Sequence, residues 1–203
     1  MAPVEIASGL WRWTARHPEW RQGATPESPA DWPAEVGSIA YLASDSLVVI
    51  DPLVPGDEDR FWAWLDRLAD QRGRRVAVLT TIKWHRRDRD RVVERYRAST
   101  SRARGALPAG VEPVAIRGAG ETMFWLAEAR ALVPGDRLLG AAGGGLRLCP
   151  ESWLGYLSSG ITLAELRRRL RPLLELPVER VLVSHGEPVL SGGHGALEAA
   201  LAS

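Results

Sequence analysis

Short apolar runs alternate with polar segments along the first quarter of the chain and predict β-strands. Residues 10–13 alternate apolar and basic side chains, which is typical of a strand with one buried face. Residues 38–41 and 46–52 predict a hairpin that turns at Asp45 and Ser46. Between these strands, residues 17–33 contain several prolines and no clear period, which predicts an irregular crossing over the surface.

Helical and strand patterns alternate in the rest of the chain. Phe61, Leu65 and Leu68 share one face of a predicted helix, whereas residues 75–81 form a continuous apolar run typical of a strand buried on both faces. Thr162 and Glu165 have the spacing of a capping box at a helix start. The predicted helices cover residues 57–71, 90–96, 162–174 and 196–201, and the predicted strands cover 75–81, 111–116, 122–126, 130–136 and 179–186. This order predicts a layered α/β sandwich, formed as a single domain over residues 1–203, and the glycine run 143–145 predicts a flexible loop.

The composition narrows the class of partners. Because 26 basic side chains face 25 acidic ones, binding to nucleic acid or to an anionic membrane is not expected. The single cysteine, Cys149, can form no internal disulfide, and we interpret it as an inert thiol. The N-terminus has no signal-peptide pattern, and no apolar run reaches the roughly 18 residues that span a bilayer. We therefore expect a soluble, cytoplasmic protein with a small-molecule substrate or ligand, whose oligomeric state the sequence leaves open.

Ionisable side chains directly follow buried apolar runs at several places. Asp51, Asp136 and His185 each end such a run, residues 83–88 follow another, and Glu121 follows a glycine turn. Charged groups are seldom buried without partners. The sequence therefore predicts that these strand ends converge on one polar network.

Five segments resemble, in order and spacing, landmarks of the metallo-β-lactamase superfamily, the hydrolase fold shared by glyoxalase II and many small thioesterases and lactonases. They are 47–52 for the early hairpin that ends in Asp-Pro, 79–88 for the His-x-His-x-Asp-His ligand motif, 118–122 for the Gly-His-Thr turn, 132–136 for the apolar-Gly-Asp step, and 183–188 for the final Gly-His-Gly turn. The resemblance extends from about Ser38 to about Leu190. It implies a four-layer αββα sandwich and a hydrolase with metal ions in its site.

The chain departs from this family at four ligand positions. Lys83 stands at the first motif histidine, Arg87 at the motif aspartate, Asp88 at the last motif histidine, and Glu121 at the histidine of the Gly-His-Thr turn. Protonated lysine and arginine donate hydrogen bonds and do not ligate metals. The resemblance therefore implies a degenerate site, in which a dinuclear zinc centre is disfavoured.

The resemblance implies a hydrolase that acts on a small ester, thioester or lactone-like molecule by water attack. It would hold at most one metal ion, for which zinc, manganese and iron suit a mixed oxygen and nitrogen ligand set. The implied ligands are His85, Asp88, Glu121, Asp136 and His185, and the implied catalytic residues are His85, Asp136, Lys83 and Arg87. The lysine or the arginine would stabilise the developing oxyanion charge.

An alternative interpretation is a metal-free, non-catalytic protein that binds a small ligand or has a structural role. Lys83 would then pair with Glu121 or Asp136, and Arg87 with Asp88 or another nearby acid, so that fixed cations replace the metal charge.

The individual residues also have structural interpretations. His85 could be a neutral histidine hydrogen-bonded beneath Trp84, and Asp51 could only fix the turn before Pro52. Trp84 and Trp125 flank the predicted site positions, so either could form a wall of a pocket.

Overall fold

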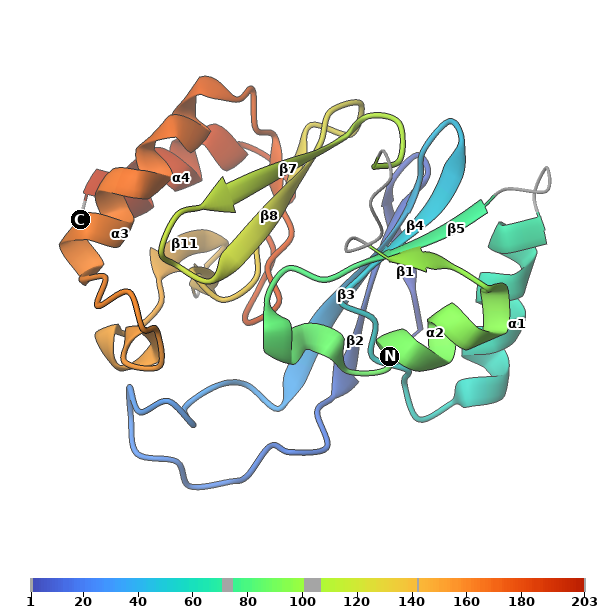
Figure 1. The fold of residues 1–203 in the computed structure, drawn as a ribbon, viewed down its shortest axis with the longest axis horizontal. Helices are drawn as coiled ribbons and strands as arrows, with labels where there is room; N and C mark the ends of the chain where they lie inside the picture. The colour runs from blue at the N-terminus through green and yellow to red at the C-terminus, as the bar shows by residue number, and fades with distance from the viewer. Residues whose placement is uncertain (1, 71–74, 101–106, 142, 203) are drawn as a thin grey trace.

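Two β-sheets face each other in the middle of the molecule, and helices cover the outer face of each (Figure 1). The computed structural model describes residues 2–70, 75–100, 107–141 and 143–202. The first sheet has the order β1-β2-β3-β4-β5-β6. Its strands are β1 (Val4–Ala7), β2 (Leu10–Arg16), β3 (Glu35–Leu42), β4 (Ser46–Ile50), β5 (Arg75–Leu79) and β6 (Ser99–Thr100). The pairs from β1 to β4 are antiparallel, and β4, β5 and β6 run parallel.

The second sheet has the order β12-β9-β8-β7, and a separate hairpin joins β10 to β11. These strands are β7 (Val111–Ile116), β8 (Glu121–Leu126), β9 (Ala131–Val133), β10 (Leu138–Ala141), β11 (Gly145–Leu148) and β12 (Arg180–Val181). The helices are α1 (Glu58–Asp70), α2 (Arg89–Tyr96), α3 (Leu163–Leu170) and α4 (Gly193–Ala202), with 3-10 turns at Lys83–Arg86, Glu151–Leu154 and Arg171–Glu175. Helices α1 and α2 lie on the first sheet, and α3 and α4 on the second (Figure 1). The predicted αββα sandwich is confirmed.

Strand β4 is buried on both faces because its alternate side chains belong to different apolar layers. Leu47 and Val49 pack with Phe61 of α1. Val48 and Ile50 point the other way and pack between the two sheets. A third apolar layer lies between the second sheet and α3 and α4. This arrangement explains the uninterrupted apolar run that the sequence has at this strand.

Two local predictions were wrong. The predicted loop at 143–145 is the turn of the β10–β11 hairpin, where Gly143 and Gly144 have φ of 82° and 87°. The predicted strand 179–186 pairs only over Arg180–Val181, and its remainder forms the turn that carries His185. The predicted helix start at Thr162 is confirmed, because the Thr162 hydroxyl accepts a hydrogen bond from the Glu165 amide at 3.2 Å, whereas the Glu165 carboxylate pairs with Arg168 and Arg169.

Within the described residues, no helix is both long enough and apolar enough to cross a membrane.

Candidate metal centre

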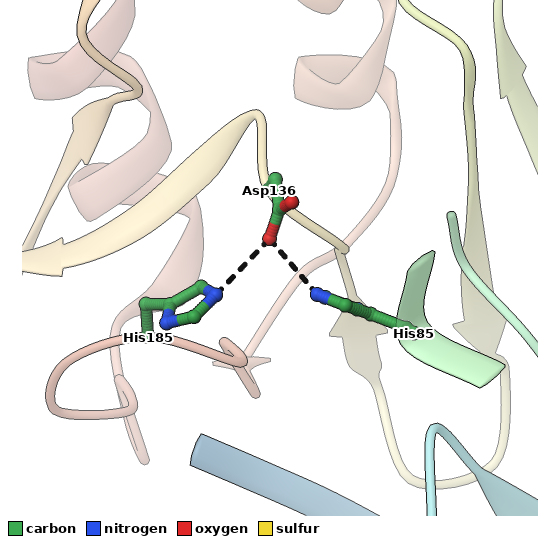
Figure 2. A group of neighbouring side chains, drawn as sticks. All are labelled: His85, Asp136 and His185. Atoms are coloured by element: carbon green, nitrogen blue, oxygen red, sulfur yellow. Dashed lines mark ion pairs between the residues drawn. The ribbon is translucent and has the colours of Figure 1, made fainter. Parts of the chain in front are cut away.

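Three side chains from distant parts of the chain meet at one edge of the sandwich. His85 lies on the 3-10 turn after β5, Asp136 on the loop between β9 and β10, and His185 on the turn after β12. Figure 2 shows the Nε2 atoms of both histidines directed at the same oxygen, Asp136 Oδ1, at 3.0 Å from His85 and 3.2 Å from His185. The three side chains are buried, and their ligand atoms lie within 4.8 Å of one another. They could hold a metal ion.

The two carboxylate oxygens of Asp136 have different surroundings. Oδ2 accepts a hydrogen bond from the Trp84 indole, but Oδ1 is buried and has no hydrogen-bond partner with acceptable angles. A buried carboxylate oxygen without a partner is uncommon. Adjacent ligands of a tetrahedral zinc ion with bonds of about 2.0–2.1 Å would lie roughly 3.3 Å apart, close to the two observed N···O distances.

Asp51 orients the His85 ring. Its Oδ2 lies 2.9 Å from His85 Nδ1, and its Oδ1 accepts the Thr81 amide at 2.9 Å. In the neutral ring, the proton therefore belongs on Nδ1, which leaves Nε2 as an acceptor that faces Asp136. Histidine ligands of metal ions commonly donate their other ring N–H to a carboxylate in this way. Asp51, interpreted from sequence as a turn residue, also positions a candidate ligand.

Glu121 does not join the group, contrary to the predicted ligand set. Its carboxylate accepts the backbone amides of Gly135 at 3.0 Å, Asp136 at 2.7 Å and Arg137 at 3.0 Å. Burial raises its pKa to about 7, against the opposing charge of Arg137. Glu121 therefore fixes the loop that presents Asp136, and Gly135 permits the close approach because a Cβ there would lie 2.9 Å from Glu121 Oε2.

Asp88 also lies outside the group. Its Oδ2 accepts the Val54 amide at 2.8 Å, and its Oδ1 lies 3.5 Å from Arg91. Because the carboxylate is engaged by the loop after β4 and by α2, it is not directed at Asp136. The prediction that Asp88 is a ligand is therefore not supported by its position.

Neither predicted ion pair of the metal-free alternative forms. Within the described part of the chain, Lys83 makes no ion pair with Glu121 or Asp136, and Arg87 makes none with Asp88. The Lys83 amine instead lies 5.6 Å from the centroid of the Trp84 ring.

Arg87 connects the two halves of the sandwich. Its Nη1 donates to the backbone oxygens of Gly37 at 2.9 Å and Asp51 at 3.0 Å, and its Nη2 donates to the Ser184 hydroxyl at 2.6 Å. Burial lowers its pKa from the ordinary arginine value, although Asp51 and Asp136 oppose this. Since both of its Nη atoms donate to backbone and hydroxyl oxygens beside His185, Arg87 positions the site instead of pairing with an acid.

The His185 turn depends on close backbone packing. Gly186 has φ of 84°, and a Cβ at this position would lie 2.5 Å from the Gly140 oxygen. The Gly140 amide donates to the His185 oxygen at 2.9 Å, so strand β10 holds this turn directly. Only glycine combines this conformation with this approach.

The charges of the three side chains are mutually dependent. Burial and Arg87 disfavour protonation of His85, but Asp136 and Asp51 outweigh them and raise its pKa to about 8. Burial lowers the pKa of His185. Burial alone would raise the pKa of Asp136, but both histidines hold it well below the ordinary aspartate value. Asp136 is therefore an anion in a partly cationic site.

A cavity of about 470 Å³ opens over the group, and aromatic rings form its walls. Trp84 lines it as predicted, whereas Trp125 packs in the apolar layer beneath α3 and α4. Trp32 and Trp153 lie with ring centroids 5.8 and 5.6 Å from that of His185. These two residues come from the β2–β3 loop and from the Glu151–Leu154 turn, and no local pattern in the sequence singled them out.

Comparisons with known proteins identify the fold of the chain. The sequence matches no family model and no curated protein. The structure is similar to a metallo-β-lactamase from Erythrobacter litoralis, with 14% identity, a TM-score of 0.61, and coverage of 98% of this chain and 90% of that one. It is also similar to the metallo-β-lactamase FIM-1 from Pseudomonas aeruginosa in its mono-zinc form, with 12% identity, a TM-score of 0.54, and coverage of 99% and 94%. A metallo-β-lactamase family protein from Thermus thermophilus has 16% identity and a TM-score of 0.51, with coverage of 98% and 80%.

Proposed function

Because the chain has the fold of the metallo-β-lactamases at low sequence identity, we propose that it is a divergent hydrolase of this fold that uses a single metal ion. The observation that carries this proposal is Asp136 Oδ1, a buried oxygen without a hydrogen bond that lies 3.0 and 3.2 Å from two histidine nitrogens. The substrate would be a small ester, thioester or lactone. The ligands would be His85, Asp136 and His185.

When bound, the ion supplies Lewis acidity, which polarises a carbonyl group and makes water a better nucleophile near neutral pH. The chain's own residues set the direction of the ligand atoms. Asp51 keeps the proton of neutral His85 on Nδ1, and the Trp84 indole occupies Asp136 Oδ2, so that Nε2 and Oδ1 remain available. Zinc accepts this mixed nitrogen and oxygen set, and manganese and iron also suit it.

The position of Arg87 disfavours a second metal ion. It stands at the motif position that would supply an aspartate, and its guanidinium lies between Asp51 and Ser184, next to His185. A fixed cation there opposes a second divalent ion by charge repulsion.

The test is a screen of aryl esters, thioesters and lactones with protein loaded separately with zinc, manganese and ferrous iron. We expect hydrolysis that is lost in Asp136→Ala and His185→Ala, and kept in His194→Ala, because His194 is exposed on α4. Activity that survives both site substitutions would place the reaction elsewhere.

A further inference from the structure

The cavity over the candidate metal centre carries an excess of cationic side chains. Its lining includes Lys83, Arg87 and Arg137, against the acids Glu19 and Asp136. Asp136 is already engaged by two histidines and an indole, and Glu121 offsets Arg137 at 4.0 Å. This leaves Glu19 as the lining acid that could offset Lys83 or Arg87. This balance favours an anionic ligand.

Lys83 is the cation most available to such a ligand. Its side chain is exposed, and the described residues offer its amine neither an ion pair nor a hydrogen bond. Its neighbours differ in this respect, because Arg86 and Arg89 both pair with Asp90. Lys83 is also the only lysine of the chain. An ammonium group at the edge of a cavity, beside an aromatic ring, is a suitable contact for a carboxylate.

Arg137 lines the same cavity but is held inside the protein. Its side chain has no exposed surface, and it donates to the backbone oxygens of Ala119 at 3.0 Å and Trp153 at 3.3 Å. Its Nε also lies 4.0 Å from Glu121 Oε2, so its charge is offset within the protein. Of the three cations that line the cavity, Lys83 is therefore the exposed one.

The walls of the cavity fit a flat apolar body. Trp32, Trp84, Trp153 and Tyr156 all line it, and Tyr156 is 68% exposed and Trp84 39% exposed. Large exposed aromatic surfaces around a cavity commonly mark a ligand site. The volume of about 470 Å³ lies in the range of small-molecule pockets.

We propose that this cavity binds a small carboxylate with a flat apolar body, with the carboxylate against the Lys83 ammonium and the body between the aromatic side chains. If the ligand is a substrate, it is an ester, thioester or lactone that carries a carboxylate, and this part rests on the proposed function. The binding itself requires no metal ion. In this proposal Lys83 recognises the substrate, and other groups stabilise the developing oxyanion.

The test detects binding through a ¹³C label placed on Lys83 itself. Reductive methylation with ¹³C-formaldehyde labels only this side chain and the N-terminal amine, and it keeps the charge. The probes are phenylacetate and its neutral analogue phenylacetamide, each titrated into metal-depleted and zinc-loaded protein. We expect phenylacetate to shift the Lys83 methyl signal saturably, and the amide to bind at least about tenfold more weakly.

Calorimetry on variants completes the test. Lys83→Met should weaken phenylacetate binding at least about fivefold, Lys83→Arg should keep it, and the matched control Arg86→Met should leave it unchanged, because Arg86 does not line this cavity. Equal affinity of Lys83→Met and the natural protein, equal affinity for acid and amide, or no binding of either probe would each overturn the proposal. Binding that depends on zinc but not on Lys83 would overturn it and leave the proposed function intact. Lys83-dependent binding by a protein that takes up no metal would support it and reject the proposed function.

Discussion

The orientation of His85 depends on one carboxylate. In Asp51→Asn, the side chain can still accept the Thr81 amide, but it presents an NH₂ group to His85 Nδ1 and so favours the ring tautomer with the proton on Nε2. We expect zinc affinity to fall about 10- to 100-fold, measured by competition with a chromophoric chelator. Asp57→Asn, at the exposed start of α1, is the matched control and should bind zinc normally. Unchanged affinity in Asp51→Asn would mean that Asp51 does not set the orientation of His85 for metal binding.

The pH dependence of metal binding follows from the protonation of His85. Because the pKa of His85 is raised to about 8 and a metal binds only the unprotonated ring, protons compete with the metal below that pH. Asp136 stays ionised, because the two histidines lower its pKa, and burial lowers the pKa of His185, so His85 is the ligand that holds its proton to the higher pH. Affinity should therefore rise about tenfold per pH unit from pH 6 and level off above about pH 8. A plateau that begins near pH 6.5 would show that Asp51 and Asp136 do not hold the proton on His85.

At the scale of elements, the His185 turn is fixed by glycine. Gly186→Ala adds both a strained φ and a clash with strand β10, and should lower the free energy of unfolding by at least about 2 kcal/mol. Gly192→Ala separates the two effects, since Gly192 also has a positive φ of 65° but no neighbour within 4 Å. Urea denaturation of both variants provides the comparison. Equal losses would mean that the contact with Gly140 contributes nothing.

The elements differ in how far local sequence could predict them. Helix α1 was predicted because burial on one face imposes a periodic pattern, and strand β4 because burial on both faces leaves a short apolar run. The β10–β11 hairpin was missed because consecutive glycines favour a turn and a flexible loop equally. Within the site, the ligand-type residues could be found by motif order. The sequence could not show that Glu121 and Asp88 accept hydrogen bonds from backbone amides, because these amides belong to loops that approach only in the folded chain.

At the scale of the whole molecule, Arg87 joins the first sheet to the turn that carries His185. Arg87→Met removes its three hydrogen bonds and leaves the backbone oxygens of Gly37 and Asp51 without this donor. We expect a loss of about 2–4 kcal/mol in the free energy of unfolding, measured by urea denaturation. Arg91→Met, which removes exposed ion pairs with Glu58 and Asp88, should have a much smaller effect. If both substitutions had similarly small effects on the free energy of unfolding, Arg87 would not stabilise the connection between the first sheet and the His185 turn.

We propose that the fold keeps one metal site and that Lys83 and Arg87 exclude a second, and the metal content of the protein tests this. The most direct measurement is elemental analysis of protein equilibrated with zinc, manganese and ferrous iron and then dialysed. A variant with Lys83→His, Arg87→Asp and Asp88→His, which restores the motif residues, is measured alongside. We expect a single ion in the natural chain, its loss in His85→Ala, and a higher metal content in the restored variant. Absence of metal from the natural chain, together with uptake by the restored variant, would contradict it.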